Sequence, residues 1–319
     1  MNDSAMAIAA SRATTWTSRR SPCENSVPYV KEKKMMPYTL RDKSAIQHEL
    51  RETRVPDGAL AIWSLGQAGF VLKNSANDIV VIDPYLTHSI EVNKPGTEFV
   101  RAFGPVVDPE DILCADAIIV THYHDDHMDL STLERVAVAR GDIPFYLPSF
   151  DADRVKADNA LIKGNVRAAV TGEAFSIGHF TVRPIPSAHS TYDKNVLGHD
   201  RFLGYVVTVD GLSFYHSGDT LVTPELEAEL TALAPDIVAL PINGGDYARI
   251  KRGIVPNMSF RDAADLANHV QADLLLPFHF DMFTCNTDNP GYFVDYMLSS
   301  YPGNKFHLMV PGERFLYFK

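Results

Sequence analysis

Short apolar runs alternate with polar turns along most of the chain, which predicts a strand-rich fold. A strand is expected where consecutive positions are rich in β-branched, aliphatic or aromatic residues and are bounded by Gly, Pro, Asn or Asp. Several of these runs are apolar at every position, as in strands that are buried on both faces. The runs cover residues 59–65, 70–73, 79–83, 115–120, 144–148, 166–170, 175–177, 180–185, 204–209, 212–216, 237–242, 273–277, 306–310 and 315–318.

Longer amphipathic segments between these runs predict helices. They cover residues 39–54, 130–139, 151–163, 224–233, 259–270 and 290–299. The stretch 84–108 contains Pro95 and Gly104, and it is expected to be a long loop of the kind that often carries function. Together these elements predict an α/β fold in which two sheets pack together and helices cover them.

One domain is predicted for residues 37–319, because no linker rich in Pro, Gly and Ser divides this part of the chain. Residues 1–36 lack a clear apolar segment, so a secretory signal is not expected there. They are interpreted as a flexible N-terminal leader. An extension upstream of a start near Met35 or Met36 is a second form of this interpretation, and a transit peptide is the alternative.

Composition and charge narrow the possible partners. The 319 residues include 40 acidic and 29 basic side chains, which gives a net charge of −11. A chain this acidic is repelled by phosphate backbones, so nucleic acid is not expected, whereas a small anionic substrate needs only a local basic site. No apolar run has the length of a membrane span. A reducing, cytoplasmic setting is predicted from three scattered cysteines without a CxxC pair, namely Cys23, Cys114 and Cys285.

The strongest chemical signal directly follows the apolar run 115–120. Three histidines and a carboxylate occur there within six residues: His122, His124, Asp126 and His127. Imidazoles and carboxylates are common ligands of zinc, manganese and iron. In an extended segment the first two side chains point the same way, and the last two follow where the chain turns into a helix. This segment is therefore predicted to supply ligands to two adjacent metal ions.

Other candidate ligands follow predicted strands elsewhere in the chain, where a packed scaffold can bring them to the same place. They are His189, Asp219 and His279. Asp83, at the end of another strand, is expected to orient a ligand histidine through the free ring N–H of that histidine. The isolated histidines are interpreted as surface or structural residues; they are His48, His88, His179, His269 and His307.

These motifs together resemble the metallo-β-lactamase superfamily over about residues 58–319. The resemblance rests on the HxHxDH run, the later single histidine, the Gly-Asp pair and the last histidine. Further segments are similar to the L-ascorbate-6-phosphate lactonase-like branch of that family. They are residues 63–70, 215–219 and 277–281, with Arg252-Gly253-Ile254 and Asn257-Met258.

The resemblance implies a four-layer αβ/βα sandwich, with two mixed sheets flanked by helices and a binuclear metal centre along one edge. The ions would be two divalent transition metals, zinc or manganese, with iron as a further alternative. The implied ligands are His122, His124 and His189 for one ion, Asp126, His127 and His279 for the other, and Asp219 for both. A homo-oligomer is also expected, although no sequence pattern specifies one.

Such a centre implies a metal-dependent hydrolase that acts on ester bonds. A bridging hydroxide would attack the carbonyl of a lactone, and Asp126 would orient this nucleophile and carry the proton to the leaving group. The resemblance favours a sugar-acid lactone, phosphorylated as in L-ascorbate 6-phosphate. No GxSxG motif indicates a serine nucleophile.

Substrate contacts and competing activities stay open at this point. A basic run is interpreted either as a clamp for a phosphate or carboxylate or as a solvated loop, and it consists of Arg249, Lys251 and Arg252. Tyr123 is a further candidate for the pocket. The same centre would also suit a nuclease- or phospholipase-like phosphodiesterase, a β-lactamase or a non-catalytic metal-binding scaffold. The acidic charge, the cytoplasmic setting and the complete ligand set argue against a nuclease, a β-lactamase and a scaffold, respectively.

Overall fold

The computed structural model describes residues 40–319, all of which belong to one compact unit, Pro37–Lys319. The strands are β1 (Ala59–Gly66), β2 (Gly69–Lys73), β3 (Ile79–Ile82), β4 (Ala117–Ile119), β5 (Phe145–Pro148), β6 (Val166–Ala169), β7 (Phe175–Ile177), β8 (Phe180–Pro186), β9 (Leu203–Val209), β10 (Leu212–His216), β11 (Ile237–Pro241), β12 (Leu274–Phe278), β13 (Lys305–Phe306) and β14 (Arg314–Phe318).

The helices lie between these strands. They are α1 (Lys43–Glu52), α2 (Ser89–Asn93), α3 (Leu130–Ala139), α4 (Ser149–Asp158), α5 (Pro224–Leu233), α6 (Tyr247–Lys251), α7 (Phe260–His269) and α8 (Pro290–Ser300), with short 3₁₀ turns η1 (Pro109–Ile112) and η2 (Thr284–Asn286). The leader predicted for residues 1–36 lies outside the described residues.

The strands form two mixed sheets of the same design. The first has the order β14-β1-β2-β3-β4-β5-β6, and the second has the order β13-β12-β11-β10-β9-β8-β7. In the first sheet β1, β2 and β3 pair antiparallel, and β3 to β6 pair parallel. The second sheet repeats this pattern, because β7 to β10 pair antiparallel and β10 to β13 pair parallel. The parallel strands of each sheet therefore end at one edge.

Strand β1, in which Ser64 is the one polar residue, shows why the central runs carry apolar side chains on both faces. Ala61, Trp63 and Leu65 pack into a core on the outer face of the first sheet, beneath α1, α3 and α4. Leu60 and Ile62 point the opposite way, into the core between the two sheets. Successive side chains of a strand alternate between its faces, so a strand with both faces covered needs apolar side chains on both.

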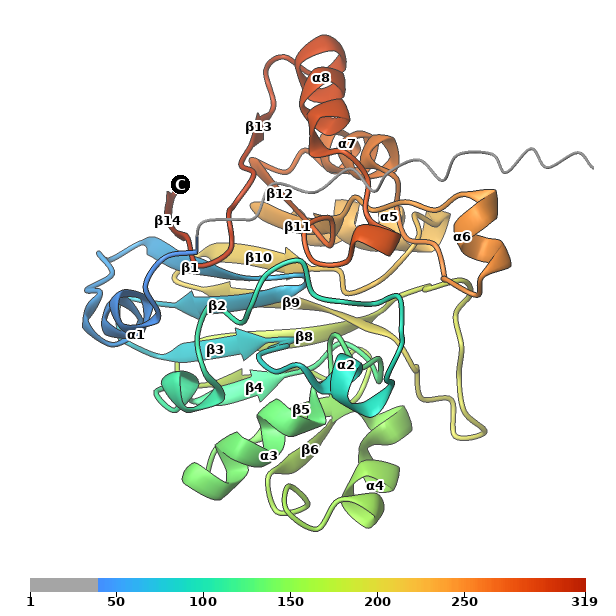
Figure 1. Ribbon diagram of the computed structural model, residues 1–319. Coiled ribbons are helices and arrows are strands. Elements are labelled where there is room, and N and C mark those ends of the chain that lie inside the picture. Colours follow the sequence, from blue (N-terminus) through green and yellow to red (C-terminus); the bar gives the residue numbers. More distant parts are fainter. Residues whose placement is uncertain (1–39) are drawn as a thin grey trace, which may run out of the picture. The chain divides into compact units, whose positions relative to one another are not determined.

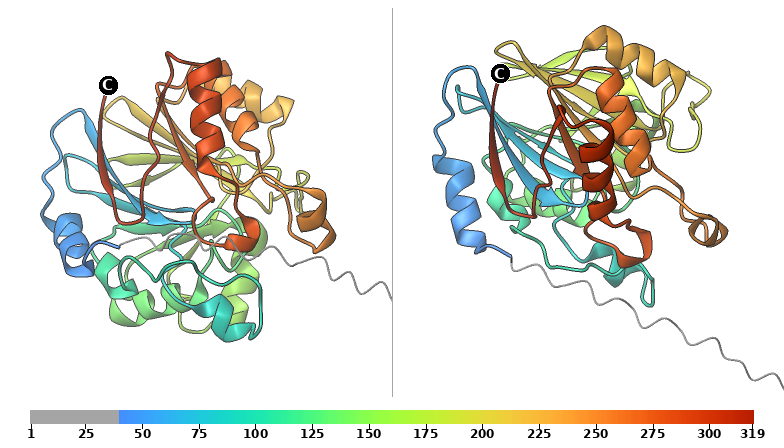
Figure 2. Two further views of the ribbon diagram at one scale, coloured as in Figure 1. Left: turned by 45° about the horizontal axis from the view of Figure 1, so that its top comes forward. Right: turned by 90° about the horizontal axis from the view of Figure 1, so that it is seen from above.

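Helices cover the outer face of each sheet (Figure 1). A third core lies on the outer face of the second sheet, where Leu226 and Leu230 of α5 and Ala263 of α7 pack. The views in Figure 2 show the green helices α3 and α4 on one side of the stacked sheets and the orange and red helices α7 and α8 on the other. The predicted architecture of two mixed sheets flanked by helices is confirmed.

Several predicted boundaries were wrong, and local hydrogen bonds explain the differences. The helix predicted to reach residue 163 ends at Asp158, because the Asn159 side chain accepts the backbone N–H groups of Leu161 and Ile162. The strand predicted over 306–310 is limited to β13, Lys305–Phe306, because the N–H of Val310 donates to the side chain of Glu313 in a turn and is not free for a strand. The expected loop 84–108 contains the short helix α2. Across residues 40–319, the helices fall short of the length and apolar character that crossing a membrane requires.

Candidate metal centre

The candidate ligands gather because the strands that precede them end at one edge of the sandwich. The HxHxDH segment follows β4 in the first sheet, and the remaining candidates follow strands of the second sheet. His189 comes after β8, Asp219 after β10 and His279 after β12. The carboxyl ends of antiparallel neighbours lie at opposite edges of a sheet. Strand β9 is antiparallel to both β8 and β10, and β10 to β12 run parallel, so β8, β10 and β12 end at the same edge and β9 ends at the other.

One cluster combines three imidazoles and a carboxylate. It consists of His122, His124, His189 and Asp219, whose candidate ligand atoms lie within 4.8 Å of one another. His122 Nε2 lies 2.9 Å from His124 Nδ1, and His189 Nε2 lies 3.7 Å from Asp219 Oδ2. All but His124 are buried. This donor set suits a divalent transition metal.

A second cluster lies beside the first and consists of Asp126, His127 and His279. Asp126 Oδ2 lies 3.4 Å from His279 Nε2 and 3.7 Å from His127 Nε2. Both imidazoles are buried, and the carboxylate is partly exposed. None of the five isolated histidines joins either cluster within the part of the chain that the structure describes.

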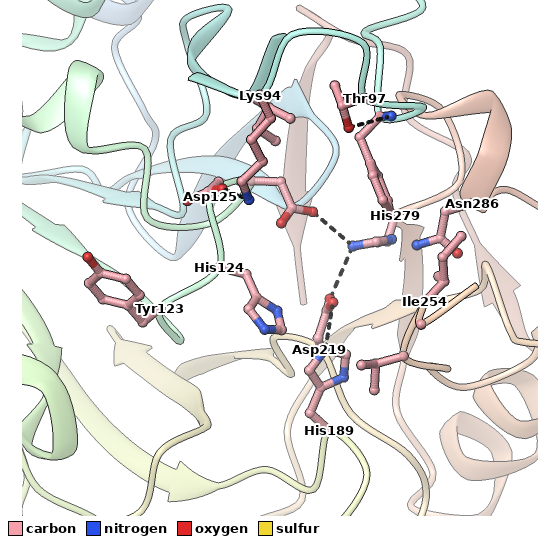
Figure 3. Close-up of a pocket in the computed structure, with 15 residues that line it drawn as sticks. Lys94, Thr97, Tyr123, His124, Asp125, His189, Asp219, Ile254, His279 and Asn286 are labelled. Atoms are coloured by element: carbon pink, nitrogen blue, oxygen red, sulfur yellow. Dashed lines mark hydrogen bonds and ion pairs between the residues drawn. The ribbon is translucent and has the colours of Figure 1, made fainter. Parts of the chain in front are cut away.

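Asp219 lies between the two clusters. Its Oδ1 is 3.2 Å from His127 Nε2 and 3.3 Å from His279 Nε2, while its Oδ2 is the atom nearest to His189. Figure 3 shows His189, Asp219 and His279 pointing toward one another across the site. The two oxygens of one carboxylate therefore face different sets of imidazoles.

Unpaired buried atoms at this place indicate that a cation belongs there. Among the described residues, His127 Nε2, His189 Nδ1 and Asp219 Oδ1 are buried without a hydrogen-bond partner. Buried polar atoms are nearly always paired in folded proteins, because leaving them unpaired costs free energy. Two of these atoms, His127 Nε2 and Asp219 Oδ1, approach each other yet form no hydrogen bond. The donor set thus fits metal ions.

The imidazoles of the site form two groups that differ in the direction of their pKa shifts. Burial lowers the pKa of His189 to about 4 and holds the pKa of His122 well below its usual value, with neighbouring histidines adding to the effect at His122. These rings are neutral, which is the form that binds metals. At His279 burial acts in the same direction, but Asp219 and Asp126 overcome it and raise the pKa to about 9. At His127 Asp219 and Asp126 likewise outweigh burial and raise the pKa.

His127 belongs to a buried hydrogen-bond network. His127 Nδ1 lies 2.7 Å from Asp83 Oδ2, and Asp83 also accepts hydrogen bonds from the backbone N–H and the hydroxyl of Thr121. The side chains of His127 and Asp83 are fully buried. The role of Asp83 as an orienting residue stays a prediction, and this contact is the geometry that such a role requires.

Two further residues, His216 and Gln67, make contacts beside the site, and the sequence analysis did not identify them as site residues. His216 Nε2 lies 2.9 Å from the carbonyl oxygen of Ala68, and His216 Nδ1 accepts from the backbone N–H of Gly218, next to Asp219. Gln67 contacts Asp126 through its side chain. The signal for both was their place within segments 63–70 and 215–219, which carried the family resemblance.

The clusters open into a cavity of about 490 Å³. Its wall includes apolar side chains, namely Ile90 of α2 and the loop residues Phe99 and Ile254. Lys94 is the basic residue among those that line it, apart from histidines, and its ammonium group lies 2.6 Å from Asp125 Oδ2. Figure 3 shows this pair at the rim of the site.

The structure brings only part of the predicted substrate set to the cavity. Tyr123 lines the wall, whereas Arg249, Lys251 and Arg252 are not among its lining residues. Arg249 is buried and bonds to Asp246 and to the carbonyl oxygen of Asn243. Asp246 is the N-cap of α6, so these contacts hold Arg249 within that helix.

Arg252 lies near the cavity without lining it. Its guanidinium lies 3.0 Å from Glu98 Oε2 and donates to the carbonyl oxygen of Cys285. Lys251 is exposed, with Nζ 6.0 Å from the centre of the Tyr247 ring. Arg252 therefore connects two loops and Arg249 supports α6, while none of the three residues of the basic run lines the cavity. Their role as a clamp stays a prediction.

Comparisons with known proteins agree with this geometry. Residues 79–280 match the Beta-lactamase superfamily domain. A metal-dependent hydrolase of Pyrococcus horikoshii is 28% identical over 232 residues, which are 72% of this chain and 88% of that protein. An Escherichia coli protein named "Probable L-ascorbate-6-phosphate lactonase" is 24% identical over 271 residues, covering 76% of this chain and 75% of that protein.

A solved structure shows the same fold. Igni18, a metallo hydrolase from Ignicoccus hospitalis, superposes with a TM-score of 0.60 at 23% identity. The match covers 82% of this chain and 100% of that one. The likeness therefore concerns the fold and covers most of the chain.

Proposed function

This chain belongs to the β-lactamase superfamily and is a metal-dependent hydrolase, and from that premise we propose that it hydrolyses an ester or lactone at a centre of two divalent transition metal ions. The observation that carries the proposal is the position of Asp219 between two clusters of imidazoles and carboxylates that open into one cavity.

The residues of each cluster have distinct roles in this proposal. His122, His124 and His189 hold one ion, and Asp126, His127 and His279 hold the other, with Asp219 shared. The mixture of imidazole and carboxylate ligands suits zinc, manganese or iron. When bound, such ions lower the pKa of a coordinated water and polarise a carbonyl oxygen.

Asp126 is the proposed catalytic residue. It lines the cavity, and its pKa lies below the usual value because His127 and His279 outweigh the effect of burial. Its carboxylate is therefore ionised at neutral pH, so it can accept a hydrogen bond from the attacking water and then take up the proton that this water loses when it attacks the carbonyl. After bond cleavage the same oxygen can pass that proton to the leaving alkoxide, as a general acid.

The proposed substrate is a small acyl compound, specifically a lactone of a sugar acid such as L-ascorbate 6-phosphate. The name of the Escherichia coli relative supports this choice. Lys94 is the group in the cavity wall that can meet a phosphate, although Asp125 must release it. Ile90, Phe99 and Ile254 would contact the carbon skeleton. We further propose that the enzyme works in the cytoplasm as a homo-oligomer.

The first test of this function measures metal content and substrate class together. Elemental analysis of freshly purified protein is expected to find close to two transition metal ions per chain, and His122→Ala should lower that number. A parallel screen compares lactones, including phosphorylated ones, with phosphodiesters. Full activity of chelator-treated protein would contradict the metal roles, and turnover of phosphodiesters alone would make the enzyme a phosphodiesterase.

A further inference from the structure

Gln67 is a buried polar residue beside the centre that the proposed function does not use. It lies in the turn between β1 and β2, where Gly66 pairs with Gly69, and it is 3% exposed. Its φ of +54° is in the left-handed region, which a residue with a side chain rarely adopts. Gln67 is not among the residues that line the cavity, so it acts on its neighbours and not on substrate.

The backbone of Gln67 is tied to the segment that carries His279. Its N–H donates to Asp281 Oδ1 at 3.0 Å, and its carbonyl oxygen accepts from the N–H of His279 at 2.9 Å. His279 itself has a φ of +63°. Strained residues of this kind persist only where surrounding contacts hold them. These bonds therefore fix both the turn and the start of the loop after β12.

The side chain of Gln67 joins two candidate ligands from different sheets. Its Nε2 lies 2.8 Å from Asp126 Oδ2 and 2.9 Å from His279 Nε2. The atom that faces Asp126 must be the amide nitrogen, because the amide oxygen would repel a carboxylate. Asp126 follows β4 of the first sheet, and His279 follows β12 of the second. The carboxamide thus donates to Asp126 and lies against the ring nitrogen of His279 that faces the centre.

We propose that Gln67 is a positioning residue that tunes one metal ion of the pair, the ion of Asp126, His127 and His279. It fixes the carboxylate of Asp126 through its side chain and the loop of His279 through its backbone. Partners of metal ligands typically change metal affinity by about 10- to 100-fold when they are removed. This inference rests on the proposed function, because it requires that the cluster binds an ion.

The experiment titrates the full-length, metal-stripped protein with Zn²⁺ by calorimetry. Gln67→Leu removes the donor at similar size, and Gln67→Gly removes the side chain while suiting the left-handed backbone. Both variants are expected to bind one ion as the wild type does and the other about 10- to 100-fold more weakly. Asn165→Leu is the matched control, because Asn165 is a buried amide that donates to the carbonyl oxygens of Gly141 and Ile143. It should leave both affinities unchanged.

A double variant identifies which ion is affected. His279→Ala should weaken the same ion, so Gln67→Gly combined with His279→Ala should bind no more weakly than His279→Ala alone. The unfolding temperature of metal-free Gln67→Gly should match or exceed that of the metal-free wild type, a result that a purely structural role would not give.

Three outcomes separate the claims. Unchanged affinity for both ions in the Gln67 variants would overturn the inference. So would an equal loss at both ions together with a lower unfolding temperature of the metal-free protein. A wild type that binds fewer than two ions would overturn the proposed function itself, before any variant is compared.

Discussion

At the scale of single residues, the centre contains three of the seven non-glycine residues that have a positive φ in the described part of the chain. Gln67, Asp83 and His279 all have positive φ values, between +45° and +63°. Each such residue costs about 1–2 kcal/mol relative to a right-handed conformation. The N–H of Asp83 is held by the carbonyl oxygen of Ile119, and that of His279 by the carbonyl oxygen of Gln67. Backbone hydrogen bonds therefore sustain conformations that aim these side chains at the site.

Asp126→Asn separates metal binding from proton transfer. The variant keeps the size of the side chain but loses its charge and its capacity to carry a proton. Turnover is expected to fall by about two to four orders of magnitude, the usual effect of losing general acid–base assistance. Metal content must be measured in the same sample, because Asp126 is also a proposed ligand. Near-wild-type turnover with both ions present would remove the proposed catalytic role.

Lys94 and Arg252 are expected to affect substrate binding differently. Lys94→Ala should raise KM mainly for a lactone that carries a remote phosphate, because Lys94 lines the cavity. Arg252→Ala should change the kinetics of phosphorylated and neutral lactones alike, since Arg252 ties two loops through Glu98 and Cys285. Steady-state kinetics on a matched pair of lactones checks both. A higher KM of Arg252→Ala for the phosphorylated lactone alone would support the clamp expected from the sequence.

At the scale of elements, a carboxylate connects the turns at the ends of the two sheets. Asp78, just before β3 of the first sheet, accepts from the backbone N–H and the Nδ1 of His179, in the β7–β8 turn of the second sheet. Both distances are 2.7 Å. Asn74 donates to the same oxygen atom. The contact therefore holds together two turns that are distant in the sequence.

Asp78→Ala should lower the free energy of unfolding by about 0.5–1.5 kcal/mol, because it removes the hydrogen bonds to His179, whose exposed donors can then bond to water. Burial opposes ionisation of Asp78, but Asn74 and His179 outweigh it and lower its pKa. A lowered pKa stabilises the fold above about pH 3.9, the unfolded value, and this stabilisation is lost as the pH falls through the folded value.

Denaturant unfolding of wild type and Asp78→Ala across the acidic range checks this prediction. The difference between the two proteins should be constant near neutral pH and should shrink toward pH 3. Asp158→Ala serves as a control, because Asp158 is an exposed residue of α4. A difference that does not change with pH would show that the charge of Asp78 contributes nothing.

Elements were predictable from the sequence where local pattern determines them. Strands with both faces covered carry apolar side chains on both, so β1, β3 and β11 stand out, and the HxHxDH segment is local as well. Helix α6 was missed because its five residues depend on the Asp246 cap and on a contact between Arg249 and Asn243. The contact of Gln67 with His279 was hidden because 212 residues separate them. Contacts between loops depend on the topology of the sheets, and this topology cannot be read from a single sequence.

At the scale of the whole molecule, the described unit should function without the N-terminal segment. Deletion of residues 1–36 is expected to leave metal content and hydrolytic activity unchanged, because that segment offers few apolar anchors in its sequence. Elemental analysis and activity assays of the truncated and full-length proteins check this. A truncated protein that folds but is inactive would place the segment at the active site or at an essential interface.

Metal removal should weaken the whole fold without abolishing it. Two ions, each at 100 times its dissociation constant, together stabilise the folded state by about 5 kcal/mol, which corresponds to roughly 10 °C in the unfolding temperature of a chain this large. When the ions leave, the buried carboxylates still have positively charged neighbours, because the pKa of His279 is about 9 and that of His127 is also raised. Protonated imidazoles then take the place of the cations beside Asp126 and Asp219.

Chelator-treated protein should therefore stay folded at room temperature, unfold about 10 °C earlier and recover when Zn²⁺ or Mn²⁺ is restored. His122→Ala should recover less, because one proposed ligand is gone, whereas Asn165→Leu should recover the full shift from its own lower baseline. Thermal scans of the same samples before and after metal addition measure this. An unfolding temperature that chelation leaves unchanged would show that no ion is held there. Complete unfolding at room temperature would instead show that imidazolium groups cannot substitute for metal ions at this edge of the sandwich.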